Sequence, residues 1–121
     1  VRPKERERQG EAMLERVGLR DKKTEYPQEL SIGQQQRAGI ARALIHRPSL
    51  VFADEPTGNL DGDNTTQVMR LFRELQKEHS TTIVMVTHAP HLTCDLDEVL
   101  RFSYVNGKTV LVSEDPNSSQ N

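Results

Sequence analysis

The segment Leu50-Val51-Phe52-Ala53-Asp54-Glu55 decides the fold, because four consecutive apolar residues lead directly into two carboxylates. A short continuous apolar run is the pattern of a strand buried on both faces. The segment 82–87 has the same character and predicts a second such strand. An amphipathic helix is predicted between them from four apolar residues at helical spacing, Val68, Leu71, Phe72 and Leu75. Strand, helix and strand in this order predict a βαβ unit with parallel strands and a right-handed crossover.

Two further helices are predicted before this unit. Residues 4–17 are compatible with a helix that stops at Gly18. Ser31 and Gln34 have the spacing of a capping box, so a second helix is expected to begin at Ser31. Arg47-Pro48 is expected to end it.

A hairpin is predicted after the βαβ unit. Asn106-Gly107 is the strongest short hairpin signal, and it separates residues 98–105 from residues 108–112. Residues 114–121 are polar and are expected to form a flexible tail, which leaves residues 1–113 for the folded part.

Composition excludes several classes of protein. The 121 residues include 16 Lys and Arg against 18 Asp and Glu, for a net charge of −2. That balance argues against a strongly basic nucleic-acid binder, and no apolar run approaches the roughly 20 residues needed to cross a bilayer. Cys94 is the single cysteine, so an intrachain disulfide is impossible and a reducing compartment is expected. The chain begins with Val1 and not with an initiator Met, so we expect it to be a piece of a longer protein. Its length is that of one domain or part of one.

The chemistry is expected at the carboxyl ends of the two strands. The first strand leads into Asp54 and Glu55, and the second leads into Thr87 and His88. Parallel strands place these ends at one edge of the sheet, where ligands bind. Asp54 could hold Mg²⁺, Glu55 could polarise an attacking water, and His88 could hydrogen-bond a phosphate or that water. The alternative for Asp54 and Glu55 is a solvated turn.

A second candidate site is the start of the helix near Ser31. The first N–H groups of a helix and its partial positive charge favour an anion. Ser31 adds a hydroxyl, and Gly33 allows close backbone approach. The alternative is an ordinary capped helix.

Together these segments closely resemble the nucleotide-binding domain of ATP-binding cassette (ABC) transporters. Leu30-Ser31-Ile32-Gly33-Gln34 is similar to the family's signature motif, and residues 50–55 are similar to its Walker B strand with the catalytic glutamate. Gly58-Asn59-Leu60-Asp61 resembles its D-loop, and His88 resembles its switch histidine. The amino-acid sequence of residues 55–61 most resembles that of the lipoprotein-release and macrolide-export branch of the family.

The resemblance implies an α/β fold of the P-loop NTPase type, with parallel core strands flanked by helices and a C-terminal β-hairpin. It implies that the chain is the C-terminal part of such a domain and is incomplete. The implied activity is Mg²⁺-dependent ATP hydrolysis coupled to transport. The implied partners are a transmembrane subunit or domain and a second nucleotide-binding domain, arranged head to tail at the cytoplasmic face of the membrane. Neither nucleic-acid binding nor direct insertion into the membrane is expected.

Roles carry over from the resemblance to matching residues only. Asp54 would support Mg²⁺, Glu55 would orient the hydrolytic water, and His88 would contact the γ-phosphate. The signature residues Ser31, Gly33 and Gln34 would face the γ-phosphate of ATP held by the partner domain. Asp61 would couple the two sites across the dimer.

Two departures from the family pattern concern the contacts with phosphate. The phosphate loop G-x-x-x-x-G-K-[ST] is absent, and Gly107-Lys108-Thr109 imitates only its end, inside the predicted hairpin. Ile32 stands where the family usually has Gly, and it could face the partner's phosphate or pack in the protein's own core. These departures leave open the alternative of a degenerate remnant without ATPase activity that acts as an interaction module, with the isolated fragment inactive in either case.

Overall fold

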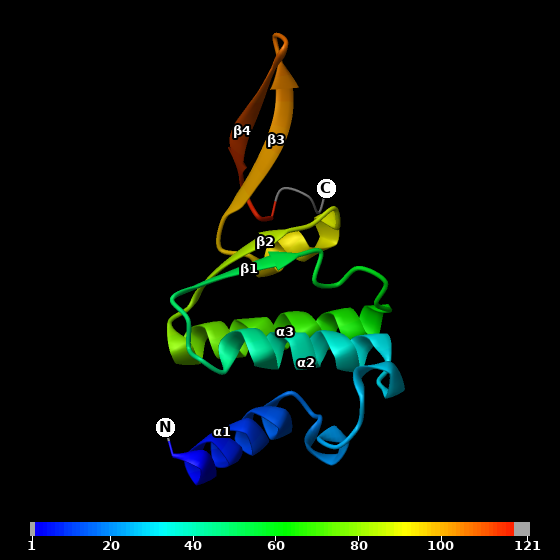
Figure 1. Cartoon of the computed structure of the whole chain (residues 1–121). Coiled ribbons are helices and arrows are strands. Elements are labelled where there is room, and N and C mark those ends of the chain that lie inside the picture. The colour runs from blue at the N-terminus through cyan, green and yellow to red at the C-terminus, as the bar shows by residue number, and fades with distance from the viewer. Residues whose placement is uncertain (1, 118–121) are drawn as a thin grey trace. The chain divides into compact units, whose positions relative to one another are not determined.

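A computed structural model of the chain describes residues 2–117, apart from the side chains of residues 94 and 95. The chain forms two compact units, Val1–Val86 and Thr87–Asn121 (Figure 1). The first unit contains α1 (Pro3–Arg16), 3₁₀ turns at Arg20–Lys22 and Pro27–Glu29, α2 (Ile32–Leu44), β1 (Leu50–Asp54), α3 (Gly62–His79) and β2 (Thr82–Val86). The second unit contains a 3₁₀ helix (Pro90–Asp95), β3 (Val99–Val105) and β4 (Lys108–Glu114).

The βαβ unit predicted from the sequence is confirmed. Strands β1 and β2 pair in parallel from Leu50↔Thr82 to Asp54↔Val86, and α3 connects them. The carboxyl ends of the two strands therefore meet at one edge of the sheet. None of the helices in residues 2–117 is both long and apolar enough to cross a bilayer.

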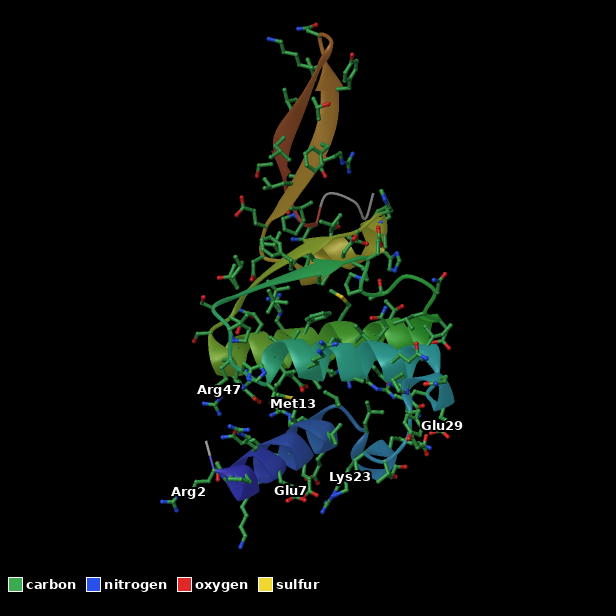
Figure 2. All side chains as sticks on the ribbon, viewed as in Figure 1. Arg2, Glu7, Met13, Lys23, Glu29 and Arg47 are labelled. Carbon is green, nitrogen blue, oxygen red and sulfur yellow. The ribbon has the colours of Figure 1, made fainter. Side chains whose placement is uncertain are left out.

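Helices α2 and α3 lie side by side and begin at the same end of the first unit (Figure 1). Leu44 of α2 and Leu75 of α3 are almost completely buried. Met13 points from α1 toward α2 and adds the third helix to the core (Figure 2). The buried cluster consists of Met13, Val17, Leu19, Ile40, Ala41, Leu44, Val51, Val68, Leu71, Phe72 and Leu75.

The expectation that β1 and β2 are buried on both faces is wrong for the described chain. Val51 is buried, and Ile83 and Met85 pack against the core. The alternate residues point the other way, and Phe52 is 75% exposed and Val86 56% exposed. Successive side chains of a strand point to opposite faces, and within the first unit helices cover only one of them. The apolar pattern therefore indicates a second covering layer that this unit does not itself supply.

The predicted end of the first helix is confirmed in detail. Gly18 adopts a left-handed conformation with φ of 74°. The Gly18 N–H donates to the carbonyl of Glu15, and the Leu19 N–H donates to the carbonyl of Leu14. This pair of bonds is a Schellman motif, which satisfies carbonyls at the end of a helix.

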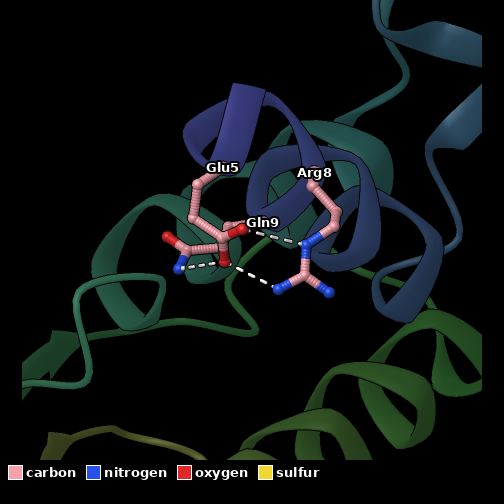
Figure 3. A network of polar contacts seen from close by, with 3 residues as sticks. All are labelled: Glu5, Arg8 and Gln9. Atoms are coloured by element: carbon pink, nitrogen blue, oxygen red, sulfur yellow. Dashed lines mark hydrogen bonds and ion pairs between the residues drawn. The ribbon is translucent and has the colours of Figure 1, made fainter. Parts of the chain in front are cut away.

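The first turns of α1 carry an exposed polar network. Arg8 donates from Nη2 to Oε1 of Glu5 over 2.6 Å, and Gln9 donates to the same oxygen over 3.2 Å (Figure 3). The hydrogen bond from Arg8 lowers the pKa of the Glu5 carboxyl. Neighbours three and four residues apart on a helix face one another, so this charge run forms a solvated helix face.

The second unit contains the predicted hairpin. Strands β3 and β4 pair antiparallel from Val99↔Glu114 to Val105↔Lys108. Asn106 and Gly107 both have positive φ, 50° and 76°, as a type I′ turn requires. The Gly107-Lys108-Thr109 triplet is therefore hairpin turn and strand, as expected.

The folded part extends slightly beyond residue 113. Glu114 is the last residue of β4, and its carboxylate forms an ion pair with Arg101 at 2.9 Å. The carbonyl of Pro116 accepts a hydrogen bond from the Thr93 hydroxyl over 3.2 Å. The rest of the expected tail, residues 118–121, lies outside the described residues.

Candidate functional site

The carboxyl end of β1 holds Asp54 and Glu55 in different environments. Asp54 is the last residue of the strand and is exposed, whereas Glu55 is partly buried. Glu55 has a positive φ of 44°, and its N–H donates to the carbonyl of Val86 over 2.7 Å. A positive φ is unfavourable for a residue with a side chain, so it persists only where the surroundings fix it. The bond to β2 fixes Glu55 at the edge of the sheet.

The turn after Glu55 leads the chain to the start of α3. The Gly58 N–H donates to the Glu55 carbonyl over 3.0 Å, and a Cβ on Gly58 would lie 3.3 Å from that oxygen. Asn59 then adopts a left-handed conformation with φ of 65°. Asp61 follows as the N-cap of α3, and its Oδ1 accepts the N–H of Asn64 over 2.8 Å. The segment expected to resemble a D-loop is thus a tight turn ending in a helix cap.

The capping box predicted at the start of α2 is confirmed. The Ser31 hydroxyl accepts the N–H of Gln34 over 3.2 Å, and Oε1 of Gln34 accepts the N–H of Ser31 over 3.0 Å. Ser31 and Ile32 are exposed, and Gly33 is buried. The helix starts at Ile32, so the N–H groups of Ile32 and Gly33 have no intrahelical partner, whereas Ser31 caps that of Gln34. This end can therefore receive an anion.

The structure brings two of these segments into contact. A Cβ placed on Gly33 would lie 2.6 Å from Oδ1 of Asn64, whose Nδ2 donates to Asp61 Oδ1 over 3.0 Å. Asn64 is a residue that the sequence analysis missed. An Asn three residues after a helix cap carries no distinguishing signal, because its importance comes from a contact with another helix.

The same end of the first unit holds all these segments. The arrowhead of β1 and the starting ends of α2 and α3 lie at that end (Figure 1). A hydrogen bond also joins α2 to α3, because Nη1 of Arg37 donates to Oε1 of Gln67 over 2.9 Å. Carboxylates, a hydroxyl and the first N–H groups of α2 therefore lie at the end of the first unit where β1 ends.

His88 belongs to the second unit. It is exposed and follows Thr87, whose hydroxyl accepts the N–H of Ala89 over 3.0 Å. The pairing of β1 with β2 places Val86, the last residue of the first unit, beside Asp54. The contact of His88 with a phosphate or with the water at Glu55 stays a prediction.

The residues at this edge suit two parts of a Mg²⁺-ATP complex, the metal ion and a phosphate. Among the described residues, no three histidine, cysteine or acid side chains gather into a group that could hold a metal ion. Mg²⁺ in phosphate sites is usually bound by one or two carboxylates, waters and the phosphates themselves. A single exposed carboxylate such as Asp54 meets that requirement, and the start of α2 suits a phosphate.

Comparisons with known proteins agree with this geometry. A family model described as ABC transporter matches residues 1–58. The macrolide export ATP-binding/permease protein MacB of Syntrophobacter fumaroxidans is 55% identical over 85 residues, which cover 70% of this chain and 12% of that protein. The lipoprotein-releasing system ATP-binding protein LolD of Hydrogenovibrio crunogenus is 44% identical over 111 residues, which cover 92% of this chain and 47% of that protein. The chain belongs to the ABC transporter family of ATP-binding domains. The names of these relatives support the lipoprotein-release and macrolide-export branch.

Solved ABC cassettes share the fold. The structure of cbiO1 from Clostridium perfringens, part of the ABC transporter complex cbiONQ, matches 96% of this chain and 45% of that one with a TM-score of 0.80 and 30% identity. A dimeric structure of the ATP-binding cassette MJ0796 in a post-hydrolysis state bound to ADP and Pi matches 83% of this chain and 44% of that one, with a TM-score of 0.70 and 33% identity. The chain thus spans less than half of the length of these relatives. Its fold is the α/β fold expected from the sequence.

Proposed function

We propose that this chain supplies the hydrolytic edge and the signature segment of an ABC-type ATPase. The observation that carries the proposal is the backbone of Glu55, which has a φ of 44° and is tied to Val86 of the neighbouring strand over 2.7 Å. Strained residues held by their surroundings are typical of functional sites. The strain places a carboxylate just beyond the end of a parallel strand, where it can accept a proton from water.

Each remaining residue has a role that suits its position. Asp54 would hold Mg²⁺, which when bound with ATP offsets negative charge on the phosphates. Ser31, Gly33 and Gln34 would present the start of α2 to the γ-phosphate of ATP held by a second cassette. Asp61 would couple the two sites across that dimer, and His88 would contact the γ-phosphate.

The proposed reaction is ATP hydrolysis coupled to transport. Its partners are a transmembrane subunit or domain and a second cassette in a head-to-tail dimer at the cytoplasmic face of the membrane. The relative MacB is named as an ATP-binding/permease protein, and MJ0796 has a dimeric structure with ADP and Pi. These names support the partners and the nucleotide proposed here.

The test is Glu55→Gln in a complete cassette that contains this chain. Gln keeps the size of the side chain and removes its ability to accept a proton. Turnover is expected to fall by about 100-fold or more, the usual scale for a positioned general base, while binding of Mg²⁺-ATP is retained. The matched control is Glu7→Gln, because Glu7 is an exposed carboxyl on α1 (Figure 2).

Two results would contradict the proposal. Unchanged turnover in Glu55→Gln would move the base role to another residue. A native complete cassette that neither binds nor hydrolyses ATP would instead favour the degenerate remnant that acts as an interaction module.

A further inference from the structure

Gly33 is a glycine for reasons of space. It lies in the first turn of α2, is buried, and is absent from the residues with positive φ, so its backbone would accept any residue. A Cβ added there would approach Oδ1 of Asn64 to 2.6 Å and its Cγ to 3.0 Å. Real Cβ atoms essentially never come that close to another atom, so either Asn64 or the helix would have to move.

Asn64 cannot easily turn away, because Asp61 holds it. The Nδ2 of Asn64 donates to Asp61 Oδ1 over 3.0 Å, and the backbone N–H of Asn64 donates to the same oxygen over 2.8 Å. An ionised carboxylate only accepts hydrogen bonds, so the amide must direct its NH₂ group toward Asp61. The amide oxygen is consequently directed at Gly33.

A second contact holds the two helices in the same register. Nη1 of Arg37 donates to Oε1 of Gln67 over 2.9 Å. Arg37 follows Gly33 by four residues and Gln67 follows Asn64 by three, so this contact lies one turn further along both helices. Helices α2 and α3 are therefore joined at two consecutive turns, beginning at their first turns.

We propose that Asn64 is a positioning residue that fixes the start of α2 relative to Asp61. Its side chain fills the space left by Gly33 and donates to the carboxylate of Asp61, so a displacement of either segment is passed to the other. The catalytic consequence rests on the function proposed above, in which residues 30–34 face the phosphate of a second cassette and Asp61 couples the two sites. The packing itself does not depend on that function.

The packing is tested by combining substitutions in a complete cassette. Gly33→Ala is expected to lower the thermal midpoint by about 5 °C because of the clash. Asn64→Ala leaves only a Cβ, 3.6 Å from the new methyl group, which is an ordinary contact. The double variant is therefore expected to have a midpoint at least as high as that of Asn64→Ala alone, which is a non-additive result.

Gly39→Ala is the matched control on the same helix. Apart from its chain neighbours and the backbone of its own helix, a Cβ on Gly39 would meet no atom within 4 Å, so only the higher helix propensity of Ala remains. This control is expected to raise the midpoint by about 2–4 °C. If Gly33→Ala raises the midpoint in the same way, no clash exists and the proposal is overturned.

The positioning role is tested by Asn64→Asp, which keeps the shape of the side chain but replaces the donor with a second carboxylate beside Asp61. The kcat for ATP hydrolysis is expected to fall about tenfold with KM for Mg²⁺-ATP unchanged, on the usual scale of coupling between sites. Asn64→Ala is expected to lower kcat in the same way, because it also removes the bond from the amide to Asp61.

A native kcat in Asn64→Asp or Asn64→Ala would overturn the positioning role. Failure of the proposed function is recognised separately, because a native cassette without ATPase activity would have no kcat to lose. The recovery of the thermal midpoint by the double variant would still decide whether Asn64 occupies the space of the Gly33 side chain.

Discussion

Ile32 provides a sharp test, because a residue packed in the core and a residue facing a partner predict different losses in the free energy of unfolding when the side chain is shortened. The sequence left open whether Ile32 packs in the protein's own core or faces a partner. In the structure Ile32 is 55% exposed, so core packing is wrong for the described chain. Ile40, on the same helix, is only 5% exposed and belongs to the buried cluster.

The expected cost of Ile32→Ala follows from this exposure. Burying a whole Ile side chain is worth about 1.5–3 kcal/mol, so the 45% of Ile32 that is buried is worth about 0.7–1.4 kcal/mol. Ala is the better helix former by up to about 0.4 kcal/mol. The net loss in free energy of unfolding is therefore about 0.3–1 kcal/mol. Ile40→Ala makes the same change at a buried position and leaves a cavity, so we expect about 2–5 kcal/mol.

Urea unfolding of a complete cassette carrying each variant measures both values. Equal losses for Ile32→Ala and Ile40→Ala would refute the reasoning, because they would mean that Ile32 is as well packed as Ile40. A second measurement tests the partner side. With Glu55→Gln present to retain ATP, Ile32→Gly is expected to raise the dimer fraction by light scattering, since the smaller residue eases close approach to a phosphate.

Three other predictions concern the ligand, the cap and pH. The isolated chain is expected to show no micromolar affinity for Mg²⁺-ATP by calorimetry, because its sequence contains no phosphate loop with the backbone nest and Lys that bind phosphates. Ser31→Ala removes the N-cap of α2 and one half of its capping box, so it is expected to lower the free energy of unfolding by about 1 kcal/mol in urea titrations. A hydrogen bond from Lys23 lowers the pKa of Glu11, so the stability from this pair is present above the ordinary pKa of a glutamate and is lost as pH falls through the lowered pKa. Thermal midpoints measured against pH in the native protein and in Lys23→Gln are expected to converge in acid.

Each of these predictions can be contradicted by a definite result. A micromolar dissociation constant for the isolated chain would show that it grips ATP without a phosphate loop. A Ser31→Ala variant as stable as the native protein would mean that solvent replaces the cap at no cost. Midpoints of the native and Lys23→Gln proteins that stay parallel into acid would mean that the exposed pair makes no pH-dependent contribution.

Local sequence signals predicted the elements of this chain well. Gly18, Asn106 and Gly107 set a helix end and a hairpin turn through their own backbone preferences, and the structure has both. The capping box of Ser31 and Gln34 was also predicted, because it involves residues three apart in one chain segment. Signals of this kind act within a few residues and need no tertiary context.

Tertiary structure decided the contacts between segments. Nothing in the sequence indicated that Asn64 lies against Gly33, because the two residues are 31 positions apart and their contact depends on how two helices pack. The positive φ of Glu55 likewise depends on a bond to the neighbouring strand. The exposure of Ile32 was open in the sequence, since an apolar residue in the first turn of a helix fits either a core or an interface.

The sequence by itself determined the order of the elements, the parallel βαβ unit and the family, because apolar periodicity and short motifs are written in consecutive residues. The tertiary structure alone decided that helices cover only one face of β1 and β2 within the first unit, where Phe52 remains 75% exposed. An apolar strand pattern indicates that the residues are suited to burial on both faces of the sheet. Whether that environment is present depends on which segments are there to pack against the strand, and the physical reason is that burial is a property of neighbours in space.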